Sequence, residues 1–213
     1  MKKRFALLGL LAFLLSALCG CGEKASLSPQ EIWEKGRGKS EEEFFSALSF
    51  DPERDARRQE MPGAAPGRAR YLADWSVEFG GETVAQTELE YTDGKFCYIH
   101  YIFDFREDSG KTLRDAYEFV ERQRETLREL YGPSCYEELF STRQGWWGEE
   151  TWSYENLKAS VKRQTYHGYG DALPLPDGDF VLLGLSADDT GYRAVHLTYQ
   201  PPWPEAVPLS PAP

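Results

Sequence analysis

Three histidines are the residues best suited to metal or acid–base chemistry, and their spacing limits what they can do. His100 and Asp104 are four residues apart, which on a helix would place them on one face. The alternation of apolar and polar residues around them predicts a strand, where four residues span about 13 Å, so the two side chains cannot share one ion. His196 alternates with apolar neighbours and should face solvent, and His167 lies in the turn-like stretch YHGYGD. We therefore predict no metal site and no cofactor.

The sequence also lacks the common motifs of catalytic sites, and its carboxylate pairs do not indicate an acid–base pair. It contains no G-x-S-x-G, H-E-x-x-H or P-loop motif. Carboxylate pairs occur at Glu149–Glu150 and Asp188–Asp189, but in a chain with 35 acidic residues such pairs are usually solvated loop residues. The sequence therefore predicts no catalytic residue.

Three tryptophans in one short stretch are the remaining candidates for binding. Trp146, Trp147 and Trp152 lie within GWWGEETW. Exposed tryptophans can stack on sugar rings or anchor a partner protein, whereas buried ones would close the open end of a core. A second candidate surface is the outward face of one strand, which carries Phe96, Tyr98, His100 and Ile102; the N-terminal helices could instead cover it.

The N-terminus combines a basic start with a short apolar run that ends in two cysteines. Lys2, Lys3 and Arg4 precede an apolar stretch that reaches Leu18, and the sequence continues Cys19-Gly20-Cys21. A charged region followed by a short apolar region is typical of an export signal, and the run is shorter than the about 20 residues that a membrane-spanning helix needs.

The sequence LCGC at 18–21 resembles the lipobox of bacterial lipoproteins, with leucine three residues before and a small residue directly before the modified cysteine. The resemblance implies that residues 1–20 are a signal peptide, that Cys21 receives a diacylglyceryl group, and that cleavage leaves Cys21 as the first residue of the mature chain. A plain secreted protein with two incidental cysteines is the alternative. Two acyl chains suffice for stable membrane anchoring, whereas one does not.

The net charge of the mature chain is consistent with this anchor and argues against binding to nucleic acids or to anionic lipid headgroups. Residues 1–20 hold three of the 24 Lys and Arg residues and no acidic residue, so 21 basic residues face 35 acidic ones in the mature chain, a net charge of −14. Such a surface repels nucleic acids and anionic lipid headgroups. We therefore expect an extracytoplasmic protein, held by membrane lipid through Cys21, that binds or scaffolds an envelope protein or glycan without catalysis. The alternative is a hydrolase of cell-wall glycan or peptide.

Helix signals are clear in two regions of the mature chain. Capping boxes SPQE at 28–31 and SEEE at 40–43 predict two short helices, and Asp51-Pro52 suggests a third. An apolar stripe of helical period runs from Leu113 to Tyr131 and ends at Gly132-Pro133. A further helix is expected over 154–166.

Period-two alternation predicts strands at 75–79, 85–91, 97–105, 180–185 and 193–199. A three-residue loop at 92–94 would pair Leu89 with Cys97 and keep one apolar face, whereas a two-residue turn would pair Leu89 with Tyr98. The long helix must pack on this apolar face. The fold class is therefore α+β: an antiparallel meander sheet with a long helix on one face and short N-terminal helices.

The strand and the long helix run back along each other, which brings their ends to one level. The strand from Cys97 travels about 27 Å, and the helix returns about 30 Å. We therefore expect Cys97 and Cys135 to lie near each other, either joined in a disulfide or as two unpaired cysteines.

The domain organisation follows from these elements. Residues 21–27 form a tether, residues 28–200 a single α+β domain, and residues 201–213 a Pro-rich extended tail. The capped helices, the meander and the long helix ending in YGP resemble uncharacterised lipid-anchored α+β proteins of Gram-positive bacteria and small envelope-assembly lipoproteins. That resemblance implies no active site.

Overall fold

The computed structural model describes residues 27–61, 66–135, 146–147, 152–162 and 168–201, without the side chains of 146–147 and 168–170. Its α-helices are α2 (Pro29–Gly36), α3 (Glu41–Ala47), α4 (Pro52–Asp55), α5 (Leu113–Tyr131) and α7 (Tyr154–Lys162), with a 3-10 turn η1 (Glu107–Ser109). The strands are β1 (Ala56–Gln59), β2 (Arg68–Ala73), β3 (Glu78–Phe79), β4 (Glu82–Thr83), β5 (Gln86–Thr92), β6 (Lys95–Asp104), β7 (Trp146–Trp147), β8 (Gly168–Pro174), β9 (Phe180–Ala187) and β10 (Arg193–Gln200).

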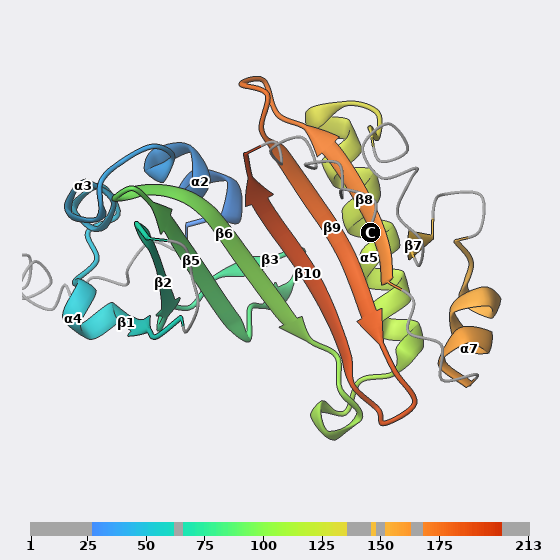
Figure 1. Cartoon of the computed structure of the whole chain (residues 1–213). Coiled ribbons are helices and arrows are strands. Elements are labelled where there is room, and N and C mark those ends of the chain that lie inside the picture. Colours follow the sequence, from blue (N-terminus) through green and yellow to red (C-terminus); the bar gives the residue numbers. More distant parts are fainter. Residues whose placement is uncertain (1–26, 62–65, 136–145, 148–151, 163–167, 202–213) are drawn as a thin grey trace, which may run out of the picture.

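Eight strands form one sheet in the order β1-β2-β5-β6-β10-β9-β8-β7 (Figure 1). All neighbours are antiparallel except β7 and β8, which are parallel. The sheet consists of two meanders, and it becomes continuous where β6 pairs with β10, the last strand of the chain. Strands β3 and β4 form a separate small hairpin. The predicted α+β class, with an antiparallel sheet and a long helix packed on one face, is confirmed.

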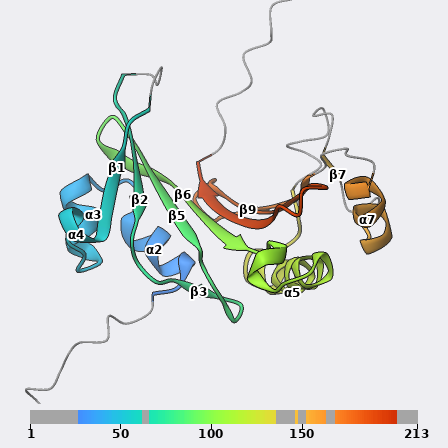
Figure 2. The same ribbon diagram turned by 90° about the horizontal axis from the view of Figure 1, so that it is seen from below.

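The helices that pack on the sheet all lie on one side of it (Figure 2). Helix α5 contacts β8, β9 and β10, and α2 and α3 contact β6. Phe119 of α5 lies 5.3 Å from Phe103 between ring centroids, and Trp33 of α2 lies 5.6 Å from Phe96 and 5.9 Å from Tyr199. One apolar core therefore fills the space between the sheet and these helices. Among the described residues no helix packs on the opposite side of the sheet, which we call the uncovered face.

The predicted helix starts are confirmed by their capping contacts. Ser28 and Ser40 each accept a hydrogen bond from the backbone N–H three residues on, and the glutamate at that position accepts one from the serine's backbone N–H. Thr112 caps α5 in the same way through Asp115, which the sequence reading did not single out. Such caps satisfy donors that the first helical turn leaves open.

The predicted register of the β5–β6 hairpin is wrong. The turn is the two-residue one: Thr92 pairs with Lys95, and Asp93 and Gly94 both have positive φ. Cys97 is an extra residue in β6, a β-bulge that shifts the register, so that Leu89 pairs with Ile99. The bulge keeps the apolar residues of β5 and β6 on one face, which the sequence prediction had attributed to a three-residue loop.

The strand predicted at 75–79 is also wrong for most of its length. Only β3 at its end is a strand, and the main pairing with β5 is made by β2. The first residues of β2 belong to the stretch MPGAAPGRAR at 61–70, whose prolines and glycines predict a loop. Strands β1, β7 and β8 were missed as well.

The predicted proximity of Cys97 and Cys135 is wrong, and no disulfide joins these two described residues, which carry thiols. The Cys135 N–H donates to Ala172 O on β8, at 2.8 Å. Strands β10 and β9 separate β6 from β8. Three inter-strand spacings amount to about 14 Å, twice what a disulfide can span. The estimate from strand and helix lengths measured distance along the strands, whereas α5 crosses to the other half of the sheet.

Several predictions concern parts outside the described residues. They include the signal peptide 1–20, the lipidation site Cys21, nearly all of the tether 21–27, and the tail beyond residue 201. Within the part of the chain that the structure describes, no helix has both the length and the apolar character needed to cross a membrane.

Candidate functional site

A row of polar side chains crosses the uncovered face from β2 to β9. Because side chains alternate along a strand, the outward positions of five neighbouring strands meet on this face. We define the polar row by its members: Arg68 and Arg70 on β2, Glu88 and Glu90 on β5, His100 on β6, His196 on β10, and Ser186 on β9.

Two histidines from neighbouring strands contact each other at the centre of the row. His100 Nε2 lies 2.9 Å from His196 Nδ1, and the rings are nearly parallel, with centroids 5.1 Å apart. Each outer nitrogen faces an oxygen: His196 Nε2 lies 2.9 Å from Ser186 Oγ, and His100 Nδ1 lies 3.6 Å from Glu88 Oε2. Four strands thus contribute one side chain each to a continuous chain of contacts.

The carboxylate fixes the direction of these hydrogen bonds. An ionised Glu88 can only accept, so the favourable tautomer of His100 carries its proton on Nδ1 and accepts at Nε2. His196 Nδ1–H then donates to His100, and His196 Nε2 accepts the Ser186 hydroxyl proton. With this assignment every contact in the chain is a donor–acceptor pair while both imidazoles are neutral.

The surroundings of the two imidazoles shift the pKa values along the chain. Burial, and then the neighbouring His100, lower the pKa of His196 to about 4. The pKa of Glu88 is lowered, mainly because His100 hydrogen-bonds to its ionised form, although burial acts in the opposite direction. At neutral pH the site therefore holds a neutral His196 and an ionised Glu88.

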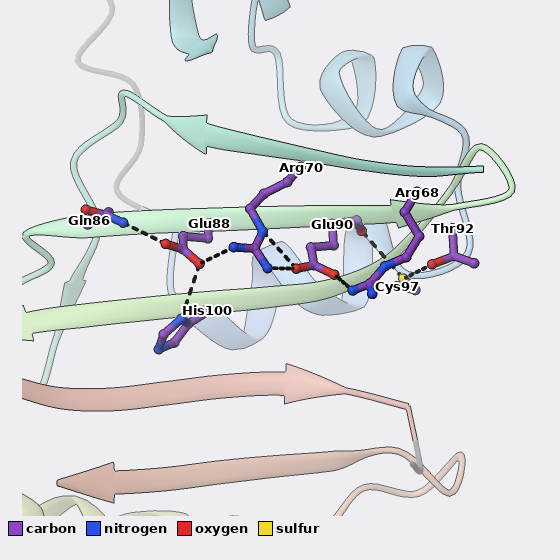
Figure 3. A network of polar contacts seen from close by, with 8 residues as sticks. All are labelled: Arg68, Arg70, Gln86, Glu88, Glu90, Thr92, Cys97 and His100. Atoms are coloured by element: carbon purple, nitrogen blue, oxygen red, sulfur yellow. Dashed lines mark hydrogen bonds and ion pairs between the residues drawn. The ribbon is translucent and has the colours of Figure 1, made fainter. Parts of the chain in front are cut away.

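The other half of the row is an ion-pair network around Glu90 (Figure 3). The side chain of Glu90 is only 6% exposed, and both Arg68 and Arg70 pair with it. Arg70 Nε donates to Glu90 Oε1 at 2.8 Å, and Arg70 also lies 3.9 Å from Glu88 Oε2. The bulged Cys97 places its Sγ 3.6 Å from the backbone oxygen of Glu90. The two arginines and two glutamates cancel in formal charge and hold each other in place before any ligand arrives.

The structure separates the side chains that the sequence had grouped on the strand of His100. Tyr98 and Ile102 are half-buried and share its outward side, whereas α2 and α3 contact β6 from the other side of the sheet (Figure 2). Phe96 was assigned to the same side, but the bulge turns it into the core, where its ring lies 4.4 Å from that of Phe44. His196 was expected to face solvent and instead contacts His100 and Ser186.

The predicted binding aromatics are divided by the structure. Trp152 is buried; its ring stacks on Tyr117 at 4.9 Å, and its Nε1–H donates to Glu121. It therefore closes part of the core, as the alternative interpretation had it. The side chains of Trp146 and Trp147 are outside the described part of the chain. For these two residues the structure defines only the backbone pairing with β8.

Other candidate residues have structural partners. Asp104 pairs with Arg106, whose hydrogen bond holds the pKa of that carboxyl below its ordinary value. Asp188 accepts hydrogen bonds from the Thr190 hydroxyl and from two backbone N–H groups of its own turn. The pair Glu149–Glu150 and His167 lie outside the described residues. Within the described ranges, no group of three or more His, Cys, Asp or Glu side chains could hold a metal ion.

No protein-family model, curated protein or solved structure matches this chain. The function must therefore be inferred from the geometry and chemistry of the chain itself. The polar row could not be read from the sequence because its central residues, His100 and His196, are 96 positions apart. The available signal was weaker: both histidines occupy outward positions of alternating strands.

Proposed function

We propose that this protein is a lipid-anchored extracytoplasmic binding module that recognises a protein partner of the cell envelope through the uncovered face. Catalysis is not part of this function. Cys21 carries the anchor, and the folded part, residues 28–200, carries the recognition surface.

The observation that carries the proposal is that, among the described residues, the helices pack on one side of the sheet only. Helices α2, α3 and α5 pack on one face of the sheet (Figure 2), while the polar row lies across five strands on the other face. An interface formed by side chains that already hold one another loses little conformational entropy on binding. A sheet face of this kind is suited to a broad, flat partner.

The composition of the uncovered face favours a protein partner over a glycan. Arginine and aromatic side chains are enriched at protein interfaces, and here Arg68 and Arg70 lie on the same face as Tyr98 and Ile102. Sugar recognition by stacking needs exposed aromatic rings. Of the described large hydrophobic residues, just Leu130 and Tyr192 are exposed, and neither belongs to the polar row.

The anchor is supported by the lipobox-like sequence at Cys21 and by the charge of the mature chain. A net charge of −14 gives the folded part no electrostatic attraction to anionic headgroups, so stable attachment requires hydrocarbon. The tether of seven residues reaches at most about 25 Å, which keeps the folded part close to the bilayer.

Site-specific photocrosslinking in living cells tests the recognition surface. A photoreactive amino acid replaces Ile102 on the uncovered face and, as the matched control, Leu130 on the solvent side of α5, where 58% of the residue is exposed. We expect a discrete adduct of constant mass, sensitive to protease, from position 102 and not from position 130. Equal adducts at both positions, or no adduct at 102, contradict the proposal. An adduct that resists protease and is cleaved by muramidase would identify a glycan instead.

A second candidate function, an envelope hydrolase, is favoured by one contact. Ser186 Oγ lies 2.9 Å from His196 Nε2, the arrangement of a nucleophile and its base. Two features oppose it: a base with a pKa of about 4 accepts a proton poorly at neutral pH, and Ser186 is only 8% exposed. A fluorophosphonate probe separates the two functions. We expect no labelling, whereas labelling that Ser186→Ala abolishes would favour the hydrolase.

A further inference from the structure

His100 Nε2 and His196 Nδ1 face each other, and we call them the inner nitrogens of the histidine pair. Their spacing indicates a function beyond holding the strands together. We propose that His100 Nε2 and His196 Nδ1 bind one divalent transition-metal ion on the uncovered face, with Cu²⁺ and Ni²⁺ preferred over Zn²⁺. This inference does not depend on the lipid anchor or on the proposed partner.

The separation of the two nitrogens sets the preference among metals. Metal–imidazole bonds are about 2.0–2.1 Å long. Two such bonds to nitrogens 2.9 Å apart enclose an angle of about 90° at the metal. Square-planar and octahedral ions accept that angle, whereas a tetrahedral Zn²⁺ site would need the nitrogens to lie about 3.3 Å apart.

Each outer nitrogen has a side-chain oxygen nearby: Ser186 Oγ lies 2.9 Å from His196 Nε2, and Glu88 Oε2 lies 3.6 Å from His100 Nδ1. A ligating histidine usually donates its other ring N–H to a carboxylate, a carbonyl or a hydroxyl oxygen, which fixes its tautomer and orientation. Glu88 can accept from His100 Nδ1–H, and Ser186 Oγ can accept from His196 Nε2–H. Both inner nitrogens then present lone pairs to the ion.

The change of protonation needed for binding is small. In the metal-free protein the His196 proton lies on Nδ1, between the two rings; on binding it moves to Nε2, and the Ser186 hydroxyl rotates to accept it. The nearby charges are Glu88, which attracts a cation, and Arg70, which lies 3.9 Å from Glu88 and offsets part of that attraction.

The protein supplies two ligands, and the remaining coordination positions lie on the uncovered face. This agrees with the finding that no described group of three or more ligating side chains surrounds the pair. Water or a donor group from a bound molecule would complete the coordination, so the site is open and exchangeable.

Calorimetric titration of the full-length protein in detergent with CuCl₂, NiCl₂ or ZnCl₂ alone tests the proposal. We expect one Cu²⁺ or Ni²⁺ per chain at this site, bound more tightly than Zn²⁺. His100→Ala and His196→Ala should each weaken binding by more than the roughly 10–100-fold that an outer-shell partner contributes, and Ser186→Ala should weaken it by about 10-fold. Metal bound elsewhere on the chain is common to all variants and gives the baseline.

Two outcomes overturn the proposal. One is an affinity that neither histidine variant lowers, and the other is a clear preference for Zn²⁺. Far-UV circular dichroism checks that each variant is folded, and His196→Gln replaces His196→Ala if the latter is not. Electron paramagnetic resonance of the Cu²⁺-loaded wild type gives a readout without any variant: we expect coupling to two imidazole nitrogens, and a spectrum without nitrogen coupling contradicts the site.

Discussion

Acidification from pH 7 to pH 5 should destabilise this protein through a single buried imidazole, that of His196. Burial and the adjacent His100 lower its pKa from 6.5 in the unfolded chain to about 4 in the folded protein. Between these two values the unfolded chain binds more protons than the folded protein, so the free energy of unfolding falls as the pH falls. The stabilising effect is fully present above pH 6.5 and is lost by about pH 4.

The size of the effect follows from the shift. At pH 5 the imidazole is protonated in the unfolded chain and almost neutral in the folded protein. The interval of about 1.5 pH units below 6.5, at about 1.4 kcal/mol per unit, corresponds to about 2 kcal/mol. Glu88 contributes little in this window, because its pKa is lowered from 4.5 and its own stabilising effect is lost only at more acidic pH.

Urea unfolding followed by tryptophan fluorescence measures the effect at pH 7 and at pH 5. The wild type should lose about 2 kcal/mol more than His196→Gln between the two pH values. His100→Gln is the matched control: it removes the neighbouring His100, the smaller cause of the shift, but leaves burial, the larger cause, so most of the loss should remain. Equal losses in the wild type and in His196→Gln would refute the assignment of a buried neutral His196.

Three further predictions concern the core and the thiols. Cys97 and Cys135 should both react with a thiol reagent in the unfolded protein without prior reduction. A thiol reductant should leave the melting temperature unchanged, and a melting temperature that falls on reduction would indicate a disulfide. Trp152→Ala should cost about 3–5 kcal/mol of stability in urea unfolding, because its buried ring leaves a cavity; a cost below about 1 kcal/mol would mean that the ring is a surface group. Gly80→Ala should cost at least about 1–2 kcal/mol, because Gly80 has a φ of 59° and an added Cβ would lie 2.1 Å from Gln123 Nε2; an unchanged melting temperature would contradict the packing of the β3–β4 turn on α5.

Local signals in the sequence predicted the helices well. The serine–glutamate capping boxes and the helical apolar stripe are formed by residues within a few positions of one another, and α2, α3 and α5 begin close to where they place them. The α+β class followed from the same signals. What these signals could not supply is the order of the strands, because the pairing of β6 with β10 joins residues about 90 positions apart.

The errors in the sheet have physical causes. The prolines and glycines of residues 61–70 predicted a loop, but Arg68 and Arg70 lie in strand β2, where their guanidinium groups pair with Glu90. The β5–β6 register depended on a bulge at Cys97, which no propensity indicates. The bulge also affects the candidate site, because it places Phe96 in the core and Cys97 beside the polar row.

The candidate site was predicted only in part. The outward strand side with Tyr98, His100 and Ile102 was recognised as a possible surface, whereas the contact of His100 with His196 depends on the strand order and was not. Nonlocal contacts of this kind become visible only when the sheet is assembled.

The central claim is that hydrocarbon on the Cys21 thiol holds an acidic, folded binding module at a membrane. The most direct measurement is metabolic labelling of cells with an alkyne-bearing fatty acid, followed by mass spectrometry of the amino-terminal peptide, for the wild type, Cys21→Ala and the control Cys19→Ala. We expect a mature chain that begins at a lipid-modified Cys21, with label retained in Cys19→Ala and abolished in Cys21→Ala. A mature chain with an unmodified amino terminus, or label that persists in Cys21→Ala, would contradict it.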